Sequence, residues 1–76
     1  MLDNQTVMTQ MLQSIGKPNL QVSHDMPLHH LPLDSLGMVE MFIDLQDEFG
    51  VNISEQDMYE VATVGELVEL FVDRAA

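Results

Sequence analysis

One serine hydroxyl and the carboxylate beside it are the residues best suited to chemistry. Asp34 and Ser35 follow a proline-containing stretch and open a long helical pattern. At the first turn of a helix, unpaired N–H groups and the helix dipole stabilise a negative group. A phosphate attached to Ser35 is therefore one interpretation of this turn. The other is a plain N-cap, in which the two side chains only satisfy backbone donors.

The rest of the chain offers little other chemistry. It contains no cysteine, which excludes disulfides, thiol nucleophiles and thiolate metal sites. His24, His29 and His30 occupy a predicted loop without supporting ligands, so we expect solvent-exposed rings and no metal site. The sequence shows no nucleophile–base pair, and 76 residues leave little room to frame a Ser–His hydrolase. We therefore expect a non-catalytic protein.

Size and charge narrow the function classes further. The 76 residues make one domain spanning 1–76, and 13 acidic residues against Lys17 and Arg74 give a net charge of -11. Such a surface repels nucleic acid and anionic membranes and favours a basic protein partner. The sequence has neither a membrane-spanning apolar run nor a signal peptide. We expect a cytoplasmic monomer, and Met1 with compact ends favours a free-standing chain.

The elements that must position these residues are helical. Four helices are expected, over residues 2–15, 35–49, 55–61 and from 63 onward, with a loop over residues 17–33. Gly16 and Gly50 end the first two helices, and no strand pattern persists. The predicted fold class is all-α: a small four-helix bundle with a short third helix as a cross-piece and a long loop between helices 1 and 2.

Caps and apolar periodicity support these helices. Ser54 with Asp57, and Thr63 with Glu66, have the spacing of capping boxes. The predicted core faces are Met8, Met11, Leu12 and Ile15; Met38, Met41, Phe42, Leu45 and Phe49; and Val64, Leu67, Val68 and Phe71. The loop is expected to be tethered to the helices by Leu20, Val22, Met26, Leu28 and Leu31.

The second helix carries an apolar stripe beyond its core face. On a helical wheel with Leu36 as the origin, Val39 and Ile43 fall at about 300° and 340°, on the side away from the core. Glu40 and Asp47 flank these three residues. An exposed apolar stripe with a charged rim is typical of a transient protein interface. The alternative is that the long loop covers the stripe.

This context resembles a known family. The segments Leu33-Asp34-Ser35-Leu36, Val39-Glu40 and 45–50 (LQDEFG) are similar to the acyl carrier protein signature. The family's later spacing is kept by Ile53, Met58, Val61, Thr63, Val64 and Phe71. The resemblance covers the whole chain, including its length and acidity.

The resemblance implies a prosthetic group and a set of partners. The serine matching Ser35 receives 4'-phosphopantetheine from coenzyme A as a phosphodiester, and the thiol of this arm holds an acyl group as a thioester. Asp34 matches a position that helps recognition by the phosphopantetheinyl transferase. Other implied partners are acyl- or aminoacyl-loading and transferring enzymes with basic docking surfaces, in fatty-acid, polyketide or related natural-product biosynthesis. The matching partner-binding residues are Leu36, Val39, Glu40, Ile43, Gln46 and Asp47.

Residues next to the D-S-L motif bear on the branch of the family. Gly37 gives a D-S-x-G-x-V-E pattern closer to D-alanyl and other aminoacyl carriers, whereas Leu33 argues against the peptide-synthetase branch, where glycine is common. The sequence also leaves open whether Tyr59 lines the interface or covers the core.

The alternative function is an unmodified helical adaptor. It would bind a basic protein through the stripe, with Ser35 serving only as a cap.

Overall fold

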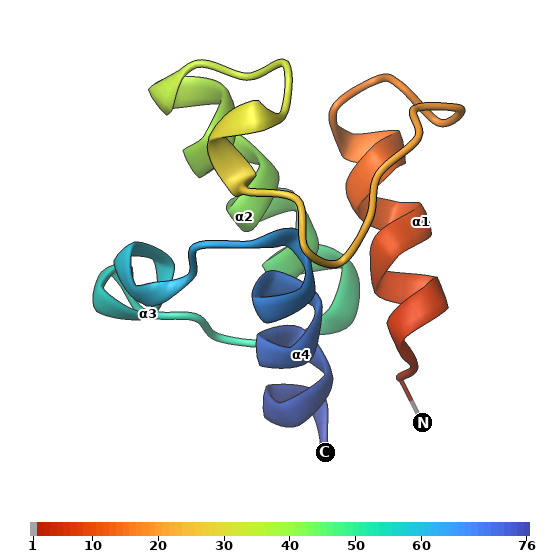
Figure 1. Cartoon of the computed structure of the whole chain (residues 1–76). Coiled ribbons are helices and arrows are strands. Elements are labelled where there is room, and N and C mark those ends of the chain that lie inside the picture. Colours follow the sequence, from red (N-terminus) through yellow and green to blue (C-terminus); the bar gives the residue numbers. More distant parts are fainter. Residues whose placement is uncertain (1) are drawn as a thin grey trace.

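The computed structural model describes residues 2–76, and this part of the chain is all-helical, as predicted (Figure 1). The elements in chain order are α1 (Asn4–Ser14), the 3-10 turn η1 (Leu28–His30), α2 (Ser35–Phe49), α3 (Glu55–Glu60) and α4 (Val64–Ala75). An isolated β-bridge joins Pro27 and Thr63, and residues 2–76 contain no longer strand. Within the same residues, every helix is too short or too polar to cross a membrane.

Four predicted helix boundaries shift by one or two residues: both ends of α1, which stops at Ser14 with Ile15 as its C-cap, the end of α3, and the start of α4, which begins at Val64 with Thr63 as its N-cap. α1 begins at Asn4 rather than residue 2, since the Asp3 carboxylate accepts a hydrogen bond from the Thr6 N–H at 2.8 Å and fixes the N-cap there. α3 ends one residue before the predicted 61, because Val61 takes extended backbone angles. α2 has the predicted bounds and ends at Gly50, whose φ of 64° is left-handed.

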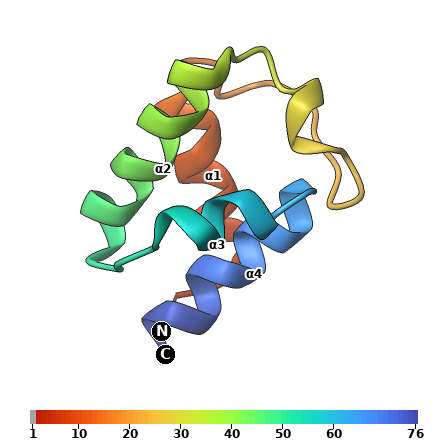
Figure 2. The same cartoon turned by 90° about the vertical axis from the view of Figure 1, so that its left-hand side faces the viewer.

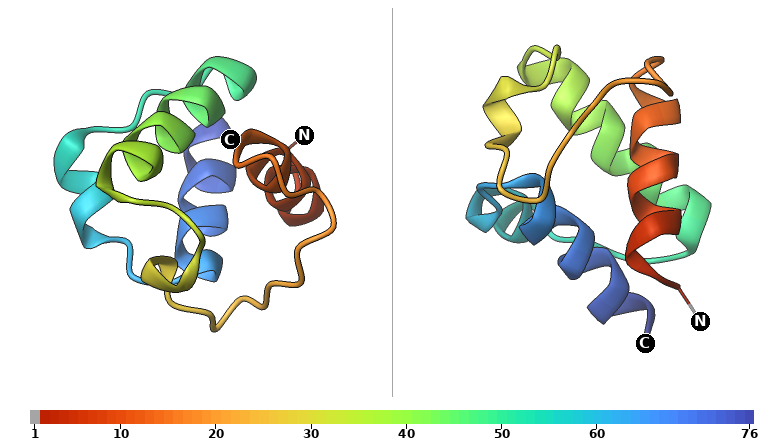
Figure 3. Two further views of the ribbon diagram at one scale, coloured as in Figure 1. Left: turned by 90° about the horizontal axis from the view of Figure 1, so that it is seen from above. Right: turned by 45° about the vertical axis from the view of Figure 1, so that its right-hand side comes forward.

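The core lies between α1, α2 and α4. Its fully buried residues from the predicted faces of α2 and α4 are Met41, Phe42, Leu45, Val64, Leu67, Val68 and Phe71. α1 packs against both α2 and α4, and α4 lies between α1 and α3 in Figures 1 and 3. The face predicted for α1 packs on the core: Met11 is fully buried, and Met8, Leu12 and Ile15 pack against the core while half-buried. Val7, which is also fully buried, was not predicted.

The connection between α1 and α2, residues 15–34, is attached to the start of α4. The first-turn N–H groups of Val64 and Gly65 donate to the carbonyls of Met26 and His24, both at 2.9 Å. The Leu28 N–H donates to the Ala62 carbonyl, also at 2.9 Å. Helix-start donors that have no partner within their own helix are thereby satisfied. These three hydrogen bonds hold η1 in place, and they thereby position the segment that leads from η1 to Ser35.

Two buried leucines secure the same connection. Leu28 and Leu31 belong to the core, as expected, and Leu20, Val22 and Met26 pack against it while half-buried. The η1 turn between them was not predicted, because a single turn of i→i+3 bonds has no sequence periodicity to detect.

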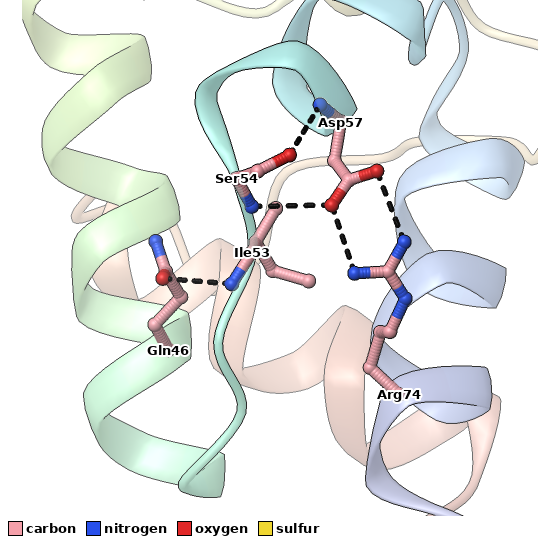
Figure 4. A network of polar contacts seen from close by, with 5 residues as sticks. All are labelled: Gln46, Ile53, Ser54, Asp57 and Arg74. Atoms are coloured by element: carbon pink, nitrogen blue, oxygen red, sulfur yellow. Dashed lines mark hydrogen bonds and ion pairs between the residues drawn. The ribbon is translucent and has the colours of Figure 1, made fainter.

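None of the six residues of α3 is fully buried, and the helix is held by Met58, which packs half-buried against the core, and by polar contacts. Ser54 and Asp57 form the predicted capping box, with both hydrogen bonds at 3.1 Å. The same Asp57 carboxylate accepts two hydrogen bonds from the Arg74 guanidinium, at 2.8 and 3.0 Å (Figure 4). One carboxylate therefore ties the start of α3 to the last turn of α4.

Candidate functional site

The Asp34–Ser35 turn lies at one end of the molecule. α2 begins at the end opposite to the start of α1 and the end of α4 (Figures 1 and 2). Asp34 is the N-cap: its extended backbone precedes the helix, and its Oδ1 accepts a hydrogen bond from the Gly37 N–H at 2.7 Å. Ser35 is the first helical residue and is exposed. Capping is thus the work of Asp34, which leaves the serine hydroxyl available for chemistry.

Gly37 has a local structural reason in this turn. A Cβ at this position would lie 3.1 Å from Asp34 Oδ1 and 3.3 Å from a Leu33 methyl carbon. Both distances are tighter than ordinary van der Waals contact, so a Cβ here would require the Asp34 carboxylate and the Leu33 side chain to shift by a few tenths of an ångström. Glycine lets that carboxylate approach the backbone closely.

The predicted exposed stripe on α2 is confirmed. Leu36, Val39 and Ile43 are 66%, 40% and 49% exposed, so the 15–34 connection does not cover them. Glu40 and Asp47 are exposed as well. An apolar stripe with carboxylates beside it therefore runs along the outer face of α2, away from the buried Met41, Phe42 and Leu45.

Tyr59 extends this apolar surface onto α3. Its ring is 78% exposed, which answers the question that the sequence left open in favour of the surface. Tyr59 and Val39 line one hollow of about 320 Å³, together with Ser35. The Tyr59 hydroxyl donates to Glu55 at 3.0 Å, and this contact with a carboxylate raises the pKa of the tyrosine.

Gln46 differs from the other residues predicted on this face. It is half-buried, and its Oε1 accepts a hydrogen bond from the Ile53 N–H at 3.0 Å (Figure 4). The side chain therefore braces the segment between α2 and α3. Its amide NH₂ is the part left for another molecule. Helical periodicity could not predict this brace, because Ile53 lies beyond the end of α2.

Ser35 lies between two surface hollows. The hollow of about 320 Å³ opens toward α3, where its apolar walls include Phe42 and Met58. The other, of about 340 Å³, opens toward η1, where Asp34 and His29 also line it. A flexible group attached to Ser35 has apolar surface on either side against which to rest.

Charge in and around the site is mostly negative. Among residues 2–76, no group of three or more His, Asp or Glu side chains is arranged to hold a metal ion.

Arg74 forms a salt bridge with Asp57. The hydrogen bonds from Arg74 and Ser54 lower the pKa of Asp57 to about 2. The same pair raises the pKa of Arg74.

Comparison with known proteins identifies the family. Residues 5–71 match the family described as the phosphopantetheine attachment site. The chain belongs to the acyl carrier protein family. An acyl carrier protein of Thermotoga maritima is 33% identical over 57 residues, covering 74% of this chain and 70% of the relative. One of Saccharopolyspora erythraea is 32% identical over 65 residues, covering 84% and 68%.

Family membership implies a 4'-phosphopantetheine prosthetic group. The residues at the start of α2 fit such a group. Ser35 supplies an exposed hydroxyl that is not needed as a cap, and the hollows on both sides leave room for an arm. Acyl carrier proteins are, as a family, carriers rather than catalysts, in agreement with the function class predicted here.

Proposed function

We propose that Ser35 carries 4'-phosphopantetheine as a phosphodiester and that the protein delivers acyl or aminoacyl thioesters to partner enzymes. The single observation that supports this most strongly is the division of roles in the Asp34–Ser35 turn. Asp34 caps α2 through its 2.7 Å bond to Gly37, so the exposed Ser35 hydroxyl has no structural task. When bound, the group supplies a thiol to a chain that has no cysteine.

The proposed route to the holo form needs a phosphopantetheinyl transferase and coenzyme A. In this proposal Asp34 has a second role, in recognition by the transferase. Its Oδ1 faces the Gly37 N–H, and the carboxylate as a whole remains exposed beside the serine. A basic transferase surface would be drawn to such a carboxylate on a protein of net charge -11.

The outer face of α2 is the proposed docking surface for these enzymes. It combines Leu36, Val39 and Ile43 with the carboxylates of Glu40 and Asp47, and Gln46 contributes through its amide NH₂. Opposite charges on the partner would speed encounter, while the small apolar stripe keeps affinity modest. Rapid exchange between successive enzymes is what a carrier requires.

The cargo class is proposed as acyl or aminoacyl, in fatty-acid, polyketide or related biosynthesis in the cytoplasm. The D-S-x-G pattern favours the aminoacyl branch, and the glycine also avoids a close contact with the Asp34 carboxylate. Thermal unfolding of the two loaded forms separates the cargo classes. A long acyl chain that enters the protein raises its Tm, whereas an aminoacyl group does not, because its ammonium resists burial.

A labelling experiment tests the attachment site. The protein is incubated with a fluorescent coenzyme A analogue and a broad-specificity transferase. Ser35→Ala should abolish labelling, whereas Ser23→Ala, at an exposed serine in the 15–34 connection, should leave it unchanged. Labelling that persists in Ser35→Ala would place the attachment elsewhere. Absent labelling of the folded unmodified sequence, with an active control carrier, would favour the unmodified adaptor.

A further inference from the structure

The hollow between η1 and α2 is lined by both His29 and Ser35, the proposed attachment residue. It has a volume of about 340 Å³ and is lined on one side by Leu28 and His29 of η1. Asp34, Ser35 and Met38 line the α2 side. Among residues 2–76, neither Lys17 nor Arg74 contributes to this lining. His29 is therefore the residue of this hollow that can carry a positive charge.

Two buried leucines on either side of His29 hold its backbone in place. Leu28, directly before it, is buried and donates its N–H to the Ala62 carbonyl at 2.9 Å. Leu31, two residues later, is 3% exposed. Two buried anchors thus fix a turn whose exposed histidine lines the hollow. His30 is also exposed, with its ring centroid 4.6 Å from that of His29, but it does not belong to the lining.

We propose that this hollow receives the phosphodiester and the adjoining part of the arm attached to Ser35, and that His29 is a positioning residue that donates a hydrogen bond to a phosphate oxygen. The inference rests on the proposed function, since it requires the arm at Ser35. It assigns to His29 a contact that neither the family match nor the sequence pattern specifies.

Charge and shape both favour this placement. A phosphodiester at Ser35 adds a negative charge close to the Asp34 carboxylate, on a protein that already carries -11. A protonated imidazole offsets that repulsion and forms a charge-assisted hydrogen bond, which is stronger than a neutral one. Two other titratable groups lie around His29: Asp34, which lines the same hollow, and His30, whose ring centroid lies 4.6 Å from that of His29. Leu33 and Val61 offer apolar walls to the carbon skeleton of the arm.

Phosphorus NMR of the holo protein tests the contact directly. The holo form is prepared with coenzyme A and a transferase, and attachment is verified by intact mass. A phosphodiester keeps one charge over the range of about pH 5 to 8 in which imidazole titrates, so any pH-dependent movement of its resonance there reports a neighbouring histidine. We expect the phosphorus chemical shift to change with pH in the holo protein and in holo His30→Gln. We expect this change to be lost in holo His29→Gln.

Nuclear Overhauser effects give a second readout that does not depend on titration. We expect contacts from the arm to Leu33 and Val61, and their weakening in His29→Gln. Because both histidines are exposed, both variants should keep the helical circular dichroism of the parent. A pH-dependent phosphorus shift that persists in His29→Gln, or arm contacts only to Met58 and Tyr59, would overturn the inference while leaving the attachment intact. Failure of the mass to increase would instead overturn the proposed function and this inference together.

Discussion

Substitution of Gly65 by alanine tests how the 15–34 connection is attached to α4. Gly65 is buried in the first turn of α4, and its N–H donates to the His24 carbonyl at 2.9 Å. A Cβ at this position would lie 2.9 Å from that same carbonyl oxygen and 3.1 Å from His24 Cβ. A contact of 2.9 Å to backbone cannot be relieved by turning a side chain, so the connection must move.

The magnitude follows from three effects. Overpacking of this kind costs about 1–3 kcal/mol. Displacement of the connection also weakens the hydrogen bonds of Gly65 and Val64, each worth about 1 kcal/mol. Alanine recovers about 1 kcal/mol in helix propensity at most. The net expectation is a loss of about 2 kcal/mol in the free energy of unfolding, or roughly 8–16 °C in Tm for a domain of this size.

The assay is thermal and urea unfolding followed by circular dichroism, with amide exchange to locate the effect. The amides of Leu28, Val64 and residue 65 should lose protection together, because they form one set of contacts. His24→Ala is the matched control, since it removes an exposed side chain and keeps the carbonyl that receives the bond. A Gly65→Ala protein as stable as the parent, with these amides still protected, would show that the close contact between residue 65 and the His24 carbonyl does not hold the connection.

Three further predictions follow from the capping turn, the stripe and the ion pair. Asp34→Ala should lower the free energy of unfolding by about 1 kcal/mol, whereas Ser35→Ala should leave it nearly unchanged in the same urea titration, because the carboxylate is the cap. Ile43→Arg should keep the parent's Tm and sharply slow transferase labelling; a folding loss would instead show that this exposed side chain supports the core. The pKa of Asp57 is lowered from 3.8 to about 2 by Arg74 and Ser54, so its contribution to stability is present above about pH 4 and is lost as pH falls through about 2. Asp57→Asn should reduce the dependence of Tm on pH in that interval, and an unchanged profile would show that the pair with Arg74 is not formed in solution.

Local signals account for what the sequence predicted well. The start of α2 at Ser35, the capping boxes of α3 and α4 and the stop at Gly50 all depend on residues within one helical turn. The buried face of α4 and the exposed stripe of α2 follow from helical periodicity, which a helix imposes whatever its neighbours. These features need no knowledge of tertiary contacts.

Features set by distant partners could not be predicted. The pairing of Asp57 with Arg74 spans 17 residues, and that of Gln46 with Ile53 joins α2 to the segment that follows it, where helical periodicity no longer holds. Val7 is buried because of the way α1 packs against α2 and α4. The sequence of α1 alone does not distinguish Val7 from the other apolar residues of the same helix. The placement of His29 and Ser35 in the lining of one hollow likewise depends on the hydrogen bonds between the 15–34 connection and α4, which no local pattern encodes.

Attachment at Ser35 is tested by the intact mass of the protein after incubation with coenzyme A and a phosphopantetheinyl transferase. We expect a gain of one phosphopantetheinyl group, placed at Ser35 by peptide mapping. An unchanged mass, with the protein folded and a control carrier fully modified in the same reaction, would contradict this expectation and leave an unmodified adaptor as the function of this fold.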